Sequence, residues 1–288
     1  MSDAPVMRVL VGYDGSVPAG AAIEAGARLL PGAHARVAHV WTPPYASEQL
    51  RRRLWRGAGC VDEFVAAVER EGRCEADRIA ATGVTLARAA GWPAEPFVAR
   101  GFGGEGFQLT EMARAAGTDL MVLGARGLSG ATAVLGSVSD MAVHYATQPV
   151  LVAPYPLLAT EYRELAEGPA LVGWDGSPGA EAALRAVIRL LPRHRPILAA
   201  VDVDEKPPPE FAEAPAVLRL STRHDHSPAA IAEVLSTAAH DQEAALVVVG
   251  SRGRAAVREI LLGSVAMATL HRAHRLVLVV PHPSPGEQ

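Results

Sequence analysis

The chain has 288 residues, which at about 150 residues per domain favours two domains over one. Hydrophobic residues make up 49% of it and aromatic residues 5%, which excludes a disordered chain and predicts cores of Ala, Val and Leu. The formal net charge of −4 gives no electrostatic argument for a nucleic-acid partner. The only lysine, Lys206, lies in Asp-Glu-Lys-Pro-Pro-Pro and not after a glycine loop, which excludes a Walker-type phosphate loop.

The first part of the chain alternates short apolar runs with helical patterns. Strands are predicted over residues 8–13, 35–41, 96–99, 120–123 and 150–153, and helices over 18–30, 61–81, 109–116 and 137–147. Strands that are apolar along their whole length and separated by helices indicate a parallel sheet with helices on both faces.

The sequence then repeats itself. LVGYDGS at 10–16 matches LVGWDGS at 171–177, and the segment from Gly124 matches the segment from Gly250. The second repeat lacks the long helix after its second strand and reaches a strand at 216–220 and a helix at Ser227-Pro228 almost directly. We therefore predict an α/β protein of two tandem doubly wound, Rossmann-like domains with parallel five-stranded sheets, residues 1–154 and 169–288, joined by a linker, residues 155–168.

Neither the cysteines nor the apolar runs indicate an oxidising compartment or a membrane. Cys60 and Cys74 fall in one predicted helix, about 21 Å apart along its axis, which is too far for a disulfide. The start MSDAPVMRVL has no apolar signal core, and no run approaches the roughly 20 residues that span a bilayer. These features predict a cytoplasmic protein with no membrane partner.

The repeated motifs fall at the carboxyl ends of predicted strands, where open parallel sheets bind ligands. Asp14 and Asp175 end the first strands, Gly124-x-x-Gly127 and Gly250-x-x-Gly253 end the fourth, and Gly136-Ser137 and Gly263-Ser264 begin the last helices. Glycines let backbone N–H groups approach a phosphate, and helix N-termini attract anions. The alternative is plain turn chemistry in which each serine caps its helix. Recurrence of all three features in both repeats favours a ligand site.

These segments resemble the universal stress protein family in its tandem form, over nearly the whole chain apart from the linker and tail. ATP-binding members carry Gly-two-Gly-nine-Gly-Ser/Thr, where the numbers count intervening residues. The second repeat has this spacing, whereas the first has one residue fewer between Gly127 and Gly136.

The resemblance implies ATP as the ligand, accompanied by Mg or Mn. Asp14 and Asp175 would contact the ribose or a phosphate-bound metal, and the backbone of Val40 would meet the adenine edge. The glycines, with Ser137-Val138 and Ser264-Val265, would hold the phosphates. The adenine position of the second repeat would fall near residues 201–203.

The resemblance also bears on assembly. In the family the fifth strand commonly pairs antiparallel across a dimer, and the two fifth strands here are residues 150–153 and 276–280. An unpaired apolar edge promotes aggregation, so we expect the two repeats to pair these edges within one chain as a pseudo-dimer. A homodimer of the whole chain is expected in addition.

The function expected is ATP binding, with the nucleotide acting as a conformational signal in a stress or dormancy response, and not catalysis. Two alternatives stay open: a slow ATP hydrolase on the same site, and an interaction module whose glycine turns are purely structural. No Gly-x-Ser-x-Gly or His-Glu-x-x-His motif supports an enzyme. Three further motifs receive ordinary structural interpretations. His224-Asp-His226 is interpreted as a solvated turn, Gly101–Gly106 as an ordinary turn, and Arg51–Arg53 with Arg56 as the polar face of a helical turn.

Overall fold

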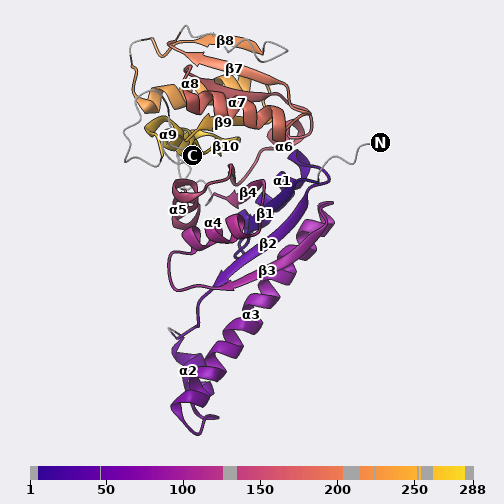
Figure 1. The fold of residues 1–288 in the computed structure, drawn as a ribbon, viewed down its shortest axis with the longest axis vertical. Helices are drawn as coiled ribbons and strands as arrows, with labels where there is room; N and C mark the ends of the chain where they lie inside the picture. The colour runs from indigo at the N-terminus through magenta and orange to yellow at the C-terminus, as the bar shows by residue number, and fades with distance from the viewer. Residues whose placement is uncertain are drawn as a thin grey trace.

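The computed structural model describes residues 6–45, 47–125, 135–203, 215–223, 225–251, 253 and 262–282, and the structural statements below concern these residues. Within them, ten strands form a single sheet in the order β3-β2-β1-β4-β5-β10-β9-β6-β7-β8 (Figure 1). Neighbouring strands in this sheet are parallel except β5 and β10, which are antiparallel. The strand order of the first repeat therefore recurs, reversed, in the second.

The first repeat contributes β1 (Arg8–Gly12), α1 (Val17–Leu29), β2 (His34–Trp41), α2 (Glu48–Trp55), α3 (Val61–Ala89), β3 (Ala94–Arg100), α4 (Glu105–Ala115), β4 (Leu120–Gly124), α5 (Ser137–Tyr145) and β5 (Val150–Ala153). After α6 (Ala159–Glu164), the second contributes β6 (Ala170–Trp174), α7 (Pro178–Leu190), β7 (Pro196–Val201), β8 (Ala216–Leu220), α8 (Pro228–Asp241), β9 (Leu246–Gly250), α9 (Ser264–Arg272) and β10 (Leu276–Val280). The predicted α/β class and the alternation of strands and helices are confirmed.

Alternate residues of each central strand enter cores on opposite faces of the sheet. In β1, Val9 and Val11 belong to the core on the side of α1, whereas Leu10 belongs to the core that includes residues of α4 and α5. All three are fully buried, as expected for a strand with helices on both faces. Both cores continue through the second repeat, so the two halves share their hydrophobic interior.

The two repeats meet at the fifth strands, as predicted. Val277 pairs with Val152, Leu278 with Leu151 and Val279 with Val150 in antiparallel register. The side chains of β5 and β10 are buried, so each strand covers an apolar edge that would otherwise promote aggregation.

The predicted linker contains a docked helix. On α6, the backbone oxygen of Tyr162 accepts a hydrogen bond from Arg28 Nε of α1 at 2.8 Å, and Glu164 pairs with the buried Arg275 of the second repeat. The helix thus contacts both halves of the chain.

The α3 helix is longer than predicted, ending at Ala89 and not near residue 81. The run Thr82-Gly-Val-Thr85 has low helix propensity, which is why the pattern suggested an end there. The structure shows that Gly83 is needed within the helix, because a Cβ there would lie 2.6 Å from Tyr13 and 2.7 Å from Val37 side-chain atoms. Close packing against the sheet therefore outweighs the local propensity.

The repeats differ most after their second strands. In the first, α2 and the N-terminal part of α3 extend away from the sheet, and β7 and β8 lie at the opposite end of the molecule (Figure 1). We call this projection, residues 47–76, the arm. Cys60 and Cys74 lie on it as free, exposed thiols. Between β7 and β8 the described residues hold no helix, and residues 204–214 lie outside the described part. None of the described helices is long and apolar enough to span a bilayer.

Candidate functional site

The aspartates at the ends of β1 and β6 hold identical turns. Asp14 Oδ1 accepts a hydrogen bond from the backbone N–H of Ser16 at 2.9 Å, and Asp175 Oδ1 accepts one from Ser177 at 3.0 Å. Each serine then caps its helix by accepting from the backbone N–H three residues further on. The intervening Gly15 and Gly176 have φ values of +85° and +70°, a conformation that favours glycine.

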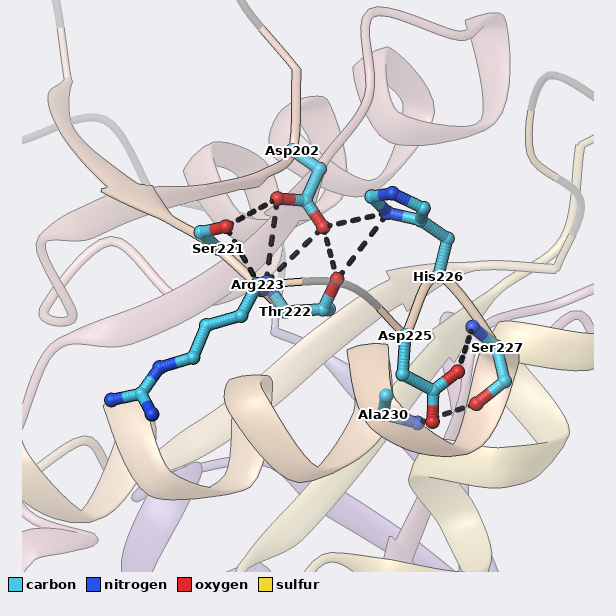
Figure 2. A network of polar contacts seen from close by, with 8 residues as sticks. All are labelled: Asp202, Ser221, Thr222, Arg223, Asp225, His226, Ser227 and Ala230. Atoms are coloured by element: carbon cyan, nitrogen blue, oxygen red, sulfur yellow. Dashed lines mark hydrogen bonds and ion pairs between the residues drawn. The ribbon is translucent and has the colours of Figure 1, made fainter.

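The same two hydrogen bonds follow β8, where no ligand was predicted and where His226 stands in place of the glycine. Asp225 Oδ1 accepts from the N–H of Ser227 at 2.9 Å, and Ser227 caps α8 (Figure 2). The bonds from Ser227 lower the pKa of Asp225. The Asp-x-Ser pattern is thus, in part, a way of starting a helix, and its recurrence alone does not indicate a ligand.

The first glycine of each predicted phosphate loop has a packing role. A Cβ on Gly124 would lie 2.7 Å from the carbonyl oxygen of Pro18, and a Cβ on Gly250 would lie 2.5 Å from that of Gly179. Glycine at these positions lets the ends of β4 and β9 approach the first turns of α1 and α7. The second glycines differ in what can be described. Gly253 lies against Asp175, with a Cβ position 2.9 Å from Oδ2, whereas Gly127 lies outside the described residues.

The helices α5 and α9 begin without a side-chain cap. Their N-cap residues are Gly136 and Gly263, so the alternative in which Ser137 and Ser264 cap these helices is wrong. Both serines are the first helical residue and are exposed. The first-turn N–H groups thus have no capping side chain, unlike those of α1, α7 and α8, and such a helix start attracts anions.

Each uncapped helix start lies close to the strand end that precedes it. The hydroxyl of Ser139 donates to the carbonyl of Gly124 at 2.9 Å, and Gly263 N donates to the carbonyl of Ser251 at 2.6 Å. Val138 and Val265, which follow the two serines, are half-buried against the core. In each repeat, the structure therefore brings the aspartate, the strand-end glycine and the helix start together at the carboxyl ends of that repeat's strands.

In the first repeat, the described residues form a pocket of about 550 Å³ beside Val40. Its wall includes His39, Val40 and Trp41 of β2, Arg53 of α2, and Glu71 and Gly72 of α3. Of these residues, sequence reasoning assigned a ligand contact only to Val40. His39 and Trp41 flank it without a recognisable motif, and Arg53, Glu71 and Gly72 lie further along the chain.

The pocket is next to the Asp14 turn. Ala76 of α3 lines the pocket, and Ile79, one turn further, lies 3.8 Å from the Cβ position of Gly15. His39 Nδ1 is 2.8 Å from the backbone oxygen of Tyr13. Burial raises the pKa of the Tyr13 hydroxyl, and the Asp14 carboxylate raises it further, so this phenol stays neutral near pH 7.

In the second repeat, the described residues at the corresponding strand ends form a polar network. Gly12 and Gly173 are equivalent residues of the repeated motif, and they pair with Ala38 and Ala199 in the neighbouring strands. Counting on from this pair, Val201 corresponds to Val40 and Asp202 to Trp41. Asp202 has a φ of 52° and accepts hydrogen bonds from Ser221 Oγ at 2.8 Å and from the hydroxyl and N–H of Thr222 (Figure 2).

His226 completes this network. Its Nδ1 lies 3.1 Å from Asp202 Oδ2, and the imidazole is otherwise exposed, as expected for a solvated turn. His224 lies outside the described residues. The hydroxyl and amide donors around Asp202 hold its pKa well below the usual range. Both carboxylate oxygens already accept several hydrogen bonds, which join the ends of β7 and β8. No three His, Cys, Asp or Glu side chains in the described part form a group that could hold a metal ion.

The fold and this edge define a tandem, doubly wound α/β protein. The Universal stress protein family matches residues 5–154 and 221–281, which is most of the chain, so the chain belongs to this family.

Three solved structures are similar over nearly the whole chain. A universal stress protein from Archaeoglobus fulgidus DSM 4304 has a TM-score of 0.68 at 18% identity, covering 96% of this chain and 98% of that one. A functionally unknown protein from Pseudomonas aeruginosa PAO1 has a TM-score of 0.53 at 12% identity, covering 96% and 92%. A putative universal stress protein from Pseudomonas aeruginosa UCBPP-PA14 has a TM-score of 0.52 at 12% identity, covering 96% and 93%. At these identities the likeness shows the fold.

Proposed function

We propose that this protein binds ATP and uses the nucleotide as a conformational signal in a stress or dormancy response, in the cytoplasm and without acting as an enzyme. The observation that carries the proposal is the meeting of Asp14, Gly124 and the uncapped start of α5 at one edge of the sheet. Orphan N–H groups and a helix dipole are suited to phosphate, and a carboxylate is suited to ribose hydroxyls or a metal.

Each residue then has a role in the proposal. Asp14 and Asp175 would hold the ribose or a phosphate-bound Mg or Mn, and the backbone of Val40 would read adenine. The phosphates would be held by Gly124, Gly127, Gly136, Ser137 and Val138 in the first repeat, and by Gly250, Gly253, Gly263, Ser264 and Val265 in the second. The Cβ position of Gly253 against Asp175 supports this set, since any side chain there would fill the space between loop and carboxylate. We also propose the domain limits 1–154 and 169–288, with 155–168 between them.

Nucleotide content tests the proposal directly. Protein purified from its expression host is denatured, and the released small molecules are identified by chromatography and mass spectrometry. We expect ATP or its adenine products, and we expect ATP to raise the melting temperature more than GTP does, because backbone groups at Val40 distinguish the two bases. Absence of nucleotide, together with no protection by either one, would instead favour an interaction module.

A matched pair of variants separates ligand binding from turn formation. Asp14→Ala and Asp225→Ala each remove the same hydrogen bond at a helix start, so both should lose a similar, small amount of stability. Only Asp14→Ala should weaken ATP binding in calorimetry. Phosphate release from ATP with Mg²⁺ or Mn²⁺ is measured on the wild type, and sustained turnover that Asp14→Ala abolishes would support the slow hydrolase instead.

The proposed homodimer is tested by light scattering with the unliganded and ATP-bound chain. The chain has a mass of 30.2 kDa, and we expect a particle of twice that mass. Because β5 and β10 already pair with each other, the interface between chains must use another surface.

A further inference from the structure

Trp41 carries a buried polar atom for which the described structure provides no partner. The indole lies at the end of β2, is 9% exposed and lines the arm pocket. Its Nε1 is buried and makes no hydrogen bond to any of the described residues. A buried N–H without an acceptor destabilises a protein, so such groups are rare and call for an explanation.

The ring is held in place by α3. A Cβ on Gly72 would lie 2.7 Å from Cζ3 and 2.9 Å from Cε3 of the indole, so the six-membered ring packs directly on the helix backbone. Glycine within this helix carries a propensity penalty, which the close contact with the indole explains. The indole is therefore fixed before any ligand binds.

The wall of the pocket opposite α3 is weakly held. The α2 helix has no buried residue, and its Arg53 pairs with Glu71 of α3 at 2.7 Å with both side chains largely exposed. Exposed pairs of this kind add little stability, so the position of α2 beside the pocket can shift at small cost.

We infer that Trp41 determines base specificity in the first repeat by donating its Nε1–H to N1 of adenine bound in the arm pocket, since this nitrogen accepts a hydrogen bond in adenine and carries a hydrogen in guanine. This inference rests on the proposed nucleotide function and adds a side-chain donor to the backbone contact at Val40, which lines the same pocket. The indole N–H is a donor only, and the ring nitrogens of adenine are acceptors. The second repeat has Asp202 at the corresponding position, an acceptor that its own network already occupies.

Calorimetry with the full chain tests this inference. Trp41→Phe keeps an aromatic ring and removes the donor, and we expect ATP affinity to fall about two- to tenfold, the range for one neutral hydrogen bond. The control is Trp55→Phe on the same arm, whose side chain is 54% exposed and outside the pocket, and which should bind as the wild type does.

Adenine analogues separate the lost hydrogen bond from lost packing. 1-Deaza-ATP, which lacks the N1 acceptor, should bind the wild type more weakly than ATP does, whereas Trp41→Phe should bind 1-deaza-ATP and ATP with equal affinity. 3-Deaza-ATP and 7-deaza-ATP serve as controls that keep N1. If Trp41→Phe is poorly folded, the indole N–H resonance of Trp41 in ¹⁵N-labelled wild type is followed instead, and its hydrogen exchange should slow with ATP.

Two outcomes overturn the inference, and they differ in what else they overturn. The inference alone is wrong if the wild type binds ATP, the loss of affinity from ATP to 1-deaza-ATP is the same in the wild type and in Trp41→Phe, and the hydrogen exchange of the indole N–H is unchanged by ATP. If the wild type binds no adenine nucleotide, the proposed function is wrong and the inference falls with it.

Discussion

Gly124 and Gly250 end their strands against the first turn of a helix, and this contact requires glycine whether or not a ligand binds. The same residues are therefore both packing residues and candidate phosphate contacts. Asp14 and Asp175 likewise hold a turn and face the proposed site. At the residue scale, a residue type that recurs in both repeats can therefore reflect packing or turn formation as well as the proposed ligand contact. Only variants matched for the structural effect can isolate the effect on ligand binding.

Gly124→Ala is predicted to destabilise the chain by about 1–3 kcal/mol, since the new Cβ would lie 2.7 Å from the Pro18 carbonyl oxygen and force the helix away. The measurement is urea unfolding without nucleotide. Gly20→Ala on α1 is the control, because its Cβ would be 3.6 Å from Leu86 Cδ1, an ordinary contact. Helix propensity predicts that this control is stabilised by up to about 1 kcal/mol. Equal effects of the two substitutions would contradict the packing role of Gly124.

Asp202 is predicted to make stability depend on pH below about 4. Its folded pKa lies below the unfolded value, so its contribution is present above the unfolded pKa of about 3.9 and is lost as the pH falls through the folded pKa. Asp202→Asn should lower the urea midpoint at pH 7, and the difference from the wild type should shrink at pH 3. A difference that is constant from pH 7 to pH 3 would show that the network does not hold the carboxylate.

At the scale of elements, the arm distinguishes the two repeats and α6 connects them. The arm of the first repeat forms the pocket beside Val40 and has no counterpart among the described residues of the second, and α6 joins both halves through polar contacts. Arg275 is 5% exposed in its side chain and donates both to Glu164 and to the carbonyl of Ala244. A buried guanidinium of this kind depends on its carboxylate partner.

Removing Glu164 from α6 is predicted to cost about 3 kcal/mol, because Glu164→Ala leaves the charge of Arg275 buried without its partner. The double variant Glu164→Leu with Arg275→Met should recover most of this loss, since no charge then remains. Glu48→Ala is the control, as it breaks an exposed pair with Arg52 that is worth less than about 1 kcal/mol. Urea unfolding of the four chains is the measurement. A double variant less stable than Glu164→Ala would contradict this account of α6.

At the scale of the whole molecule, the chain is a pseudo-dimer whose halves share one sheet and continuous cores. Because β5 and β10 pair antiparallel, the strands of one repeat run in the opposite direction to those of the other, and each proposed site lies at the carboxyl ends of its own strands. The described parts of the halves are not equivalent, because Trp41 of the first repeat lines a pocket whereas the corresponding Asp202 of the second is held in a polar network.

The two sites are predicted to bind ATP unequally, with the first repeat tighter despite its shorter spacing between Gly127 and Gly136. Leaving about 100 Å² of apolar surface exposed in the second repeat would cost roughly 2.5 kcal/mol, whereas a glycine-rich loop can relax to recover a lost contact. Calorimetry should show two phases, and Asp14→Ala should remove the tighter one. If Asp175→Ala removes it instead, the order of the sites is reversed.

Gly253→Asp is less suited to this comparison, although a carboxylate there would also repel phosphate. Its Cβ would already lie 2.9 Å from Asp175 Oδ2, so the variant would disturb the turn at β6 without any ligand. Asp175→Ala removes a group and adds none, and the Asp225→Ala control applies to it equally.

The sequence by itself determined the alternation of strands and helices, the twofold repeat and the shortened second half. The bounds of β5 and β8 agree with those predicted, because each is a short apolar or alternating run between clear turn residues. The pairing of β5 with β10 followed from a family resemblance together with the aggregation hazard of two apolar edges. These features are local, or repeat within the chain, so they can be read without coordinates.

Only the tertiary structure decided which residues meet at the site. Asp202, Thr222 and His226 are brought together because β7 and β8 are neighbours in the sheet. Trp41, Arg53 and Gly72 are brought together because α3 packs against β2 and α2 packs against α3. The end of α3 and the lack of a capping role for Ser137 were likewise set by packing, not by propensity. Contacts between distant segments depend on sheet order and helix placement, and no short pattern along the chain specifies either.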